Sequence, residues 1–214
     1  MLPGRHRDPQ GVPYTSQTVN LRDEEQKAHF LENVNPRGKV PALRDESVGL
    51  TLFESLIINE YLAEACPGGE ALLPRDAATR ARIRLWNEHL DTQLAPAHFT
   101  LLMNKDDSAQ DTKRAALDAA LAVYEESLVG PYLCGDTFTL ADAAALPFFE
   151  RLVFSLVHFK QHDALSAYPR TRRWLETAMD RDSFKTTKRP EAKLVELYER
   201  FLAMDYKFGG LNKN

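Results

Sequence analysis

The sequence contains few cysteines, no excess of basic residues and no long hydrophobic segment. Cys66 and Cys134, two among 214 residues, are too few for a disulfide framework and do not have the spacing of metal ligands. The chain has 27 Lys and Arg residues and 31 Asp and Glu residues, so it has no excess of positive charge. This argues against a nucleic-acid partner, because proteins that bind nucleic acids need a basic surface. The longest apolar stretch, Ala143–Phe149, is far shorter than the roughly 20 residues that cross a bilayer.

The N-terminal segment also lacks the apolar core of a secretory signal. We therefore expect a cytoplasmic protein with no membrane partner. The six histidines form no metal-ligand pattern, since His158 and His162 are four apart but have only Asp163 as a nearby carboxylate, so we expect no metal site. The remaining composition, 43% apolar and 27% charged, is that of an ordinary folded protein.

The first part of the chain has a mixed pattern of short strands and helices. Tyr14–Leu21 is rich in Thr, Val and Tyr and predicts a strand, and Arg22–Asn33 predicts a modest helix. Lys39–Leu43 and Leu50–Phe53 flank a turn-like segment and predict an antiparallel pair. Glu54–Ala65 has apolar residues on one helical face and is followed by Pro and Gly, which end a helix.

The second part predicts helices joined by short turns, with a bend or interruption near Pro96. The expected helices cover Ala77–Lys105, Ser108–Leu128, Thr139–Phe159, Pro169–Asp180 and Pro190–Tyr206. The fold class is therefore α/β plus all-α. We place the smaller domain at residues 1–66, a linker at 67–76 and the all-helical domain at 77–214.

Lys39-Val40-Pro41 is the first of three motifs with possible chemistry. A proline within a strand removes a backbone donor and therefore belongs at an edge or a bend. If the Val40–Pro41 bond is cis, the backbone N–H and C=O of Val40 face outward and can pair with an extended, peptide-like ligand. An ordinary trans proline on an edge strand is the alternative.

Glu54-Ser55 is the second motif, because it opens the apolar helix. The N–H groups and dipole of a helix start attract a carboxylate, while Glu54 could neutralise an adjacent ammonium group. Together these groups would hold the head of an α-amino acid. A helix cap without any ligand is the alternative interpretation of Ser55.

Thr139-Leu140-Ala141-Asp142 is the third motif and has the form of a capping box. In this arrangement the side chains of Thr139 and Asp142 each bond the backbone of the other residue. We expect it to stabilise the fold by about 0.5–2 kcal/mol and to take no part in chemistry.

These segments occur in one order: NPRGKVPAL (Asn35–Leu43), LFES (Leu52–Ser55), IINEYLAEA, then CGDTFTLAD (Cys134–Asp142). That order resembles the cytosolic glutathione transferase family, from about residue 12 to about residue 202. The resemblance implies a thioredoxin-like first domain that binds glutathione, followed by the helical domain. It further implies that Val40, before Pro41, pairs with the cysteinyl backbone of glutathione, that Glu54 and Ser55 hold its γ-glutamyl end, and that Lys39 holds its glycyl carboxylate.

Members of this family use a Ser, Tyr or Cys near the first strand or first helix. Here Met1–Gly11 precede Val12-Pro13-Tyr14, and eleven residues cannot supply a strand plus a three-turn helix. We therefore expect an incomplete, N-terminally truncated thioredoxin-like domain without the first strand, most or all of the first helix and the activating residue. No catalytic residue is assigned. A shortened form of an enzyme, a non-catalytic protein, and a substitute hydroxyl from Tyr14 or Ser16 stay open.

The resemblance implies a glutathione transferase or a glutathione-dependent thioltransferase, which uses the thiol of glutathione on a small electrophile or a disulfide. The alternative is a non-catalytic, glutathione-transferase-like protein-interaction module. The segment Pro147–Leu165 and the following Tyr168–Phe184 are similar to the Cys-type branches, such as the omega-like, lambda-like and thiol-dependent reductase groups. Family members usually form dimers, so a homodimer is expected.

Overall fold

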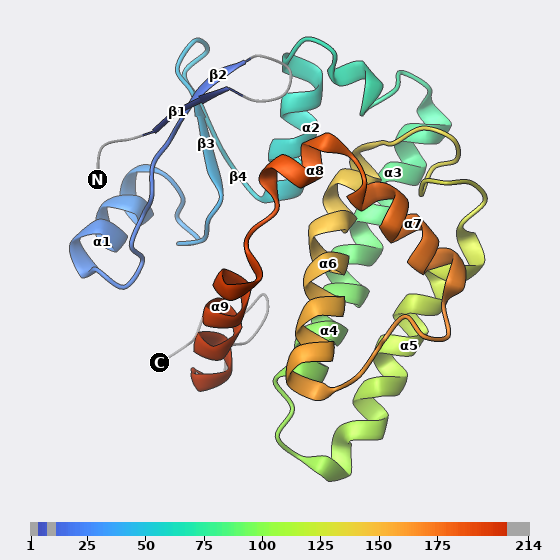
Figure 1. The fold of residues 1–214 in the computed structure, drawn as a ribbon. Coiled ribbons are helices and arrows are strands. Elements are labelled where there is room, and N and C mark those ends of the chain that lie inside the picture. Colours follow the sequence, from blue (N-terminus) through green and yellow to red (C-terminus); the bar gives the residue numbers. More distant parts are fainter. Residues whose placement is uncertain (1–3, 8–11, 205–214) are drawn as a thin grey trace. The chain divides into compact units, whose positions relative to one another are not determined.

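The computed structural model describes residues 4–7 and 12–204, and the chain divides into two compact units, Met1–Leu73 and Pro74–Asn214 (Figure 1). The division lies between Leu73 and Pro74. The first unit combines short strands with helices, whereas the described part of the second is helical apart from one isolated bridge, between Tyr132 and Gly135. The predicted fold class, α/β plus all-α, is confirmed. Along the described ranges no helix is both long and apolar enough to cross a membrane.

The first unit contains two small antiparallel sheets. β1 (Gly4–Arg7) pairs with β2 (Pro13–Ser16), and β3 (Ala42–Asp45) pairs with β4 (Leu50–Phe53). In the second pair Ala42 lies opposite Phe53, and Asp45 lies opposite Leu50. The antiparallel pair predicted from the sequence is therefore confirmed.

A short strand lies before Val12: Gly4–Arg7 pairs antiparallel with β2, with Gly4 opposite Ser16 and Arg7 opposite Pro13. The strand that the sequence analysis expected to be absent is one followed by a three-turn helix, so β1 leaves that expectation a prediction. An antiparallel partner needs only a short connection, so the residues before Val12 suffice for this strand.

Two helices complete the first unit, followed by a 3₁₀ turn at Gly69–Ala71 (η1). In α1 (Glu24–Asn33) the carboxylate of Asp23 accepts the N–H of Gln26, and Phe30 is buried. In α2 (Ser55–Ala65) the buried residues are Ile58 and Ala63. After α2 the chain passes so close to this helix that a Cβ at Gly69 would lie 2.0 Å from the carbonyl oxygen of Ala63. Position 69 therefore requires glycine.

The second unit begins with a long helical segment interrupted once. α3 (Ala77–His89) continues through a π-helical turn, η2 (Leu90–Leu94), into α4 (Ala95–Leu102). The interruption predicted near Pro96 is confirmed. It occupies the turn immediately before the proline, because Pro96 has no N–H to continue the helical hydrogen bonds from that turn.

The remaining helices follow with short connections. They are a 3₁₀ turn η3 (Asp107–Ala109), α5 (Gln110–Ser127), α6 (Leu140–Lys160), α7 (Pro169–Met179), α8 (Asp182–Thr187) and α9 (Glu191–Ala203). The sequence analysis did not predict α8. This six-residue helix buries one residue, Phe184, and so has no periodic apolar pattern.

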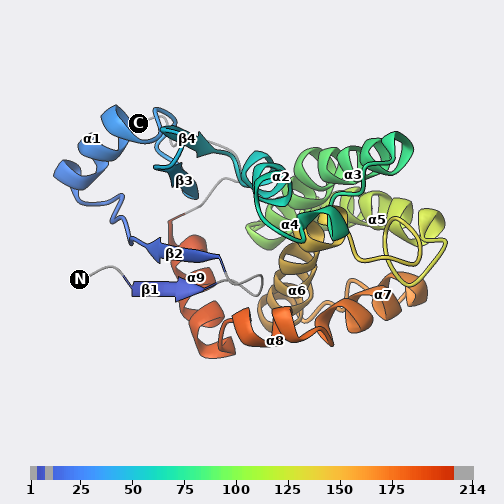
Figure 2. The ribbon, with the colours of Figure 1, turned by 90° about the horizontal axis from the view of Figure 1, so that it is seen from above.

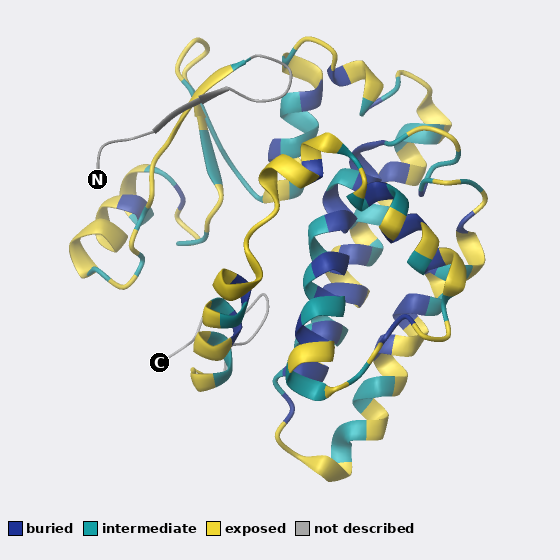
Figure 3. Cartoon of the chain, viewed as in Figure 1, coloured by how far each residue is buried: buried dark blue, intermediate teal, exposed yellow. Residues whose placement is uncertain are grey.

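Helix α6 forms the centre of the second unit. Eleven of its residues are buried, and Figure 3 shows dark-blue segments alternating with teal along this helix. The ring of Phe149 packs edge-on against Tyr124 of α5, with centroids 4.8 Å apart, and against Trp174 of α7, at 4.9 Å. All three side chains are buried. These aromatic contacts join α5, α6 and α7 in one core.

Thr139 and Asp142 form a capping box at the start of α6. The buried carboxylate of Asp142 accepts the N–H of Thr139 at 2.8 Å. It also accepts the N–H of Leu133 and the indole N–H of Trp174, each at 2.8 Å. One side chain thus connects the helix start to the preceding loop and to α7.

Candidate functional site

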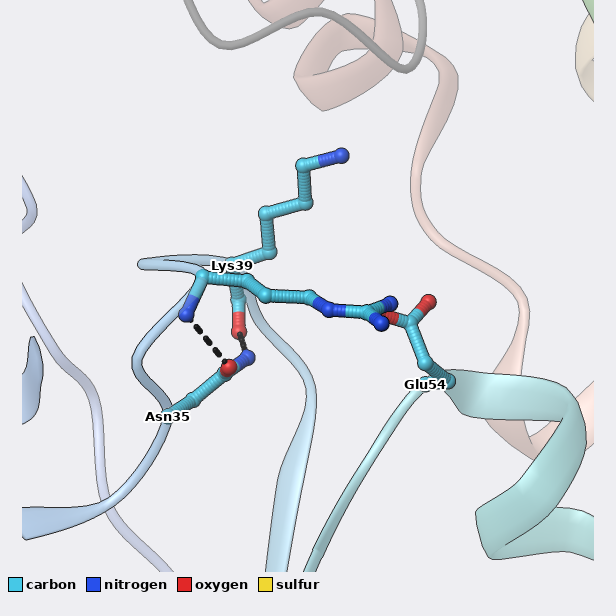
Figure 4. A network of polar contacts seen from close by, with 4 residues as sticks. Asn35, Lys39 and Glu54 are labelled. Carbon is cyan, nitrogen blue, oxygen red and sulfur yellow. Dashed lines mark hydrogen bonds and ion pairs between the residues drawn. The ribbon is translucent and has the colours of Figure 1, made fainter.

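The candidate site begins with the loop between α1 and β3, which Asn35 holds in place. Asn35 is 1% exposed; its Nδ2 donates to the carbonyl oxygen of Lys39 at 2.6 Å, and its Oδ1 accepts the N–H of Arg37 at 2.9 Å. Gly38, with φ of 62°, lets the chain reverse between these bonds. Figure 4 shows both bonds and the side chain of Lys39 extending from this loop. The two hydrogen bonds of the buried Asn35 side chain therefore fix the backbone of this loop.

The peptide bond between Val40 and Pro41 is cis, which confirms the geometry considered in the sequence analysis. Val40 is 58% exposed, and Pro41 is exposed as well. Both residues directly precede β3. The structure therefore places Val40 at the surface of the first unit, where the sequence analysis expects an extended ligand.

Glu54 lies across from this loop at the start of α2. Its Oε1 accepts a hydrogen bond from Nη1 of Arg37 at 2.7 Å, and the Arg37 guanidinium carbon lies 5.5 Å from the ring centre of Phe53. The side chains of Arg37 and Glu54 keep 61% and 40% of their exposure. An ion pair this accessible contributes little to stability, about 0–1 kcal/mol. Its effect is to orient the carboxylate.

The backbone of Glu54 is unusual for a residue with a side chain. Its φ is 71° and its ψ is 114°, a conformation that costs on the order of 1–3 kcal/mol for a residue other than glycine. Strain of this size occurs mainly where a side chain is held for binding or chemistry. The conformation thus marks Glu54 as a candidate functional residue independently of any motif.

The N-terminus of α2 is open beside Glu54. Within the described part of the chain no side chain caps this helix, and its first turn contains no acidic residue. Ser55, the first residue of α2, is exposed. A helix start in this state carries a partial positive charge and N–H donors directed outward, which suits a carboxylate ligand.

The five predicted glutathione-binding residues therefore lie in two neighbouring segments of the first unit. Lys39, Val40 and Pro41 belong to the loop before β3, while Glu54 and Ser55 open α2. The Arg37–Glu54 ion pair joins the two segments. No cluster of three or more metal-ligating side chains occurs in residues 4–7 and 12–204.

Sequence reasoning missed two residues of this site, Asn35 and Arg37. An Asn-Pro pair favours the start of a turn, so the signal for Asn35 was present in Asn35-Pro36. Arg37 gave no such signal, because its partner is 17 positions away and the pair is exposed. Arg37 bonds one carboxylate oxygen of Glu54, and the second oxygen, Oε2, has no hydrogen-bond partner among the described residues.

Comparison with known proteins supplies the family. A model described as glutathione S-transferase, N-terminal domain, matches residues 9–64, and one described as glutathione S-transferase, C-terminal domain, matches residues 107–177. The chain is 33% identical over 181 residues to a glutathione S-transferase-like protein, LUC7, of Fusarium sp, covering 81% of this chain and 78% of that protein. It is 32% identical over 191 residues to glutathione S-transferase 3 of Zea mays, covering 83% and 82%.

Solved structures agree with the sequence matches. Glutathione transferase Omega 3C from Trametes versicolor has a TM-score of 0.75 and 29% identity, covering 91% of this chain and 83% of that chain. Glutathione transferase F7 from Populus trichocarpa has a TM-score of 0.65 and 27% identity, covering 82% and 84%. The first unit is thus a small thioredoxin-like domain and the second a helical domain, and the chain belongs to the glutathione S-transferase family.

Proposed function

We propose that this protein binds glutathione at the first unit and uses its thiol on an electrophile or a disulfide. The observation that carries the proposal is the open N-terminus of α2 next to the strained carboxylate residue Glu54. An amino-acid head group has one carboxylate and one ammonium group. The helix start and Glu54 offer one complementary partner for each.

The two oxygens of Glu54 divide their roles in this proposal. Arg37 holds Oε1 at 2.7 Å, which fixes the side chain toward the loop. The ammonium of the γ-glutamyl group then approaches Oε2, and the γ-glutamyl carboxylate accepts from the exposed Ser55 and the first N–H groups of α2. Arg37 is therefore a positioning residue in this proposal.

The other end of glutathione extends toward the loop before β3. In the proposal, the backbone of Val40 pairs with the cysteinyl residue and Lys39 attracts the glycyl carboxylate. Both assignments rest on the resemblance of NPRGKVPAL to the family. The exposure of Val40 supports them, because a ligand can reach this residue.

Glutathione binding can be tested by isothermal titration calorimetry with the full chain. We expect Glu54→Gln to weaken binding about tenfold or more, since it removes the charge that faces the ammonium group. Glu46→Gln is the matched control, because Glu46 lies exposed between β3 and β4, outside the site. Equal affinities for the two variants, or no binding by the unmodified protein, would refute the proposed site.

Activity separates an enzyme from an interaction module. We expect glutathione conjugation to an aryl halide or glutathione-dependent reduction of hydroxyethyl disulfide, and the Cys-type branch predicts the second reaction. Glutathione binding without either reaction would favour the non-catalytic module. We also propose a cytoplasmic homodimer, which sedimentation and fractionation can test.

A further inference from the structure

Positive charge is concentrated where α8 connects to α9. Residues 183–193 contain four basic side chains and one acidic side chain, Glu191, so they carry a net charge of +3 in a chain whose net charge is −4. We call residues 183–193 the basic segment. All of its basic residues are exposed: Lys185, Lys188, Arg189 and Lys193.

The backbone of the basic segment is extended between the two helices. Lys188 has φ of −55° and ψ of 133°, and Pro190 has φ of −57° and ψ of 140°, which are close to polyproline II values. The ring of Pro190 fixes its own φ and restricts Arg189 to extended conformations. Figure 1 shows this connection as an open stretch of ribbon, Figure 2 shows α8 and α9 from above, and Figure 3 shows the exposed connection in yellow. A segment restrained in this way loses little conformational entropy when a partner binds.

The apolar side chains around the basic segment face the interior. Phe184 of α8 and Leu194 of α9 are both buried, and they anchor the two ends of the connection. No large apolar side chain of residues 183–193 is exposed. A basic surface that binds a lipid bilayer usually adds exposed Trp, Phe or Leu side chains that enter the bilayer. The basic segment therefore fits a charged partner in water better than a membrane.

Two cations of the basic segment are held only by exposed ion pairs. Nζ of Lys185 lies 2.6 Å from Oδ1 of Asp180, and Nζ of Lys193 lies 2.9 Å from Oε2 of Glu196. The side chains of the two lysines are 51% and 67% exposed. Ion pairs this accessible to water are weak, so the carboxylate of a partner can replace either acidic residue.

The other two cations, Lys188 and Arg189, make no ion pair within residues 4–7 and 12–204. Glu150 of α6 is close enough to be influenced by Lys188, but no hydrogen bond joins them among the described residues. Burial raises the pKa of Glu150, although the charges of Lys188 and Arg151 act in the opposite direction. Lys188 and Arg189 therefore keep their hydrogen-bond donors for a carboxylate from outside the chain.

We propose that the basic segment binds an acidic, extended segment of a partner protein. Asp and Glu side chains of the partner accept hydrogen bonds from Lys188 and Arg189 and complement the charge of the whole segment. Separate carboxylates suit this surface better than a polyphosphate chain, because the acidic residues Asp182 and Glu191 lie among the cations and would repel continuous negative charge. The site is built from residues of the second unit alone, so it does not depend on glutathione binding.

A short fluorescein-labelled peptide that alternates glutamate with glycine is the probe. Its affinity for the full chain is measured by fluorescence anisotropy at an ionic strength of about 0.01 M, where surface charges are little screened. The variant carrying Lys188→Gln and Arg189→Gln should bind the peptide about tenfold more weakly. Raising the ionic strength to about 0.15 M should weaken binding to the unmodified protein.

A matched control separates the local site from the net charge of the protein. The variant carrying Lys27→Gln and Arg75→Gln loses the same charge at exposed positions outside the basic segment, so its affinity should stay within about twofold of that of the unmodified protein. A labelled peptide that alternates glutamine with glycine should not bind. Circular dichroism confirms that both variants are folded.

Three results would overturn the proposal. The first is equal loss of affinity in the two double variants, and the second is equal binding of the glutamate and glutamine peptides. The third is sedimentation of the protein with vesicles of phosphatidylserine and phosphatidylcholine while the glutamate peptide does not bind, which would assign the basic segment to a membrane surface.

Discussion

The Nε2 atom of His98 lies 2.7 Å from the hydroxyl oxygen of Ser155, and this hydrogen bond joins α4 to α6 inside the second unit. His98 is 2% exposed and Ser155 is fully buried. Burial lowers the pKa of His98 from 6.5 to about 3, because the charged imidazolium would lose its hydration. The ring is therefore neutral at physiological pH, and its role is structural.

This neutral histidine predicts a loss of stability in mild acid. The unfolded chain takes up a proton near pH 6.5 and the folded chain only near pH 3, so stability falls as the pH drops through this interval. At about pH 5 the loss should be about 2 kcal/mol relative to pH 7. Urea unfolding of the unmodified protein and of His98→Gln at both pH values measures it. An equal pH dependence in the two proteins would contradict the prediction.

Glu125 predicts a second stability effect. Its carboxylate, on α5, accepts the N–H groups of Arg170 and Thr171 at 3.0 and 2.9 Å and the hydroxyl of Thr171 at 2.8 Å. Although partial burial by itself raises its pKa, these donors prevail and hold the pKa below the ordinary value. Glu125→Ala should cost about 2–3 kcal/mol, because the first turn of α7 loses its acceptor. Exposed Glu126→Ala should change stability by less than about 0.5 kcal/mol in the same chemical unfolding experiment.

Tyr124 predicts an effect in the opposite direction. Its ring stacks on Trp86 at 4.7 Å, but its buried hydroxyl has no hydrogen-bond partner in the part of the chain that the structure describes. Tyr124→Phe keeps the ring contacts and removes the unsatisfied group. The variant should be as stable as the unmodified protein or more stable by about 1 kcal/mol. A lower thermal unfolding midpoint would show that the hydroxyl is bonded in solution.

Substitutions of Glu54 and Thr139 should affect different properties, the first glutathione affinity and the second the stability of the fold. Glu54→Ala should weaken glutathione binding more than Thr139→Ala does, because Glu54 faces the proposed ligand. Thr139→Ala should lower the free energy of unfolding by about 0.5–2 kcal/mol, since Thr139 belongs to the capping box of α6. Calorimetry and urea unfolding of both variants give the two quantities. Equal effects on both would contradict this division of roles.

Local patterns in the sequence were enough to predict the periodic elements. The apolar spacing of Glu54–Ala65 and the β-rich segments Lys39–Leu43 and Leu50–Phe53 correspond to α2, β3 and β4. These elements were predictable because neighbouring residues determine them. Strand β1 and helix α8 were not, since the first depends on its partner strand and the second has a single buried residue.

Contacts between polar residues far apart in the sequence could not be predicted from the sequence either. The Arg37–Glu54 pair is separated by 17 positions, and Glu125 reaches Thr171 across 46. Neither pair has a periodic or compositional signal, because any of several polar or charged residues could have been the partner. The motif containing Glu54 was predictable, whereas its orientation by Arg37 required the structure.

The backbone of Glu54 has a consequence for directed evolution. Glycine adopts a φ of 71° without a steric penalty, so replacement of Glu54 by glycine should make the fold more resistant to heat. A library screened for thermostability alone would therefore enrich glycine at this position and lose the carboxylate. Only a screen that also selects for ligand retention would keep it.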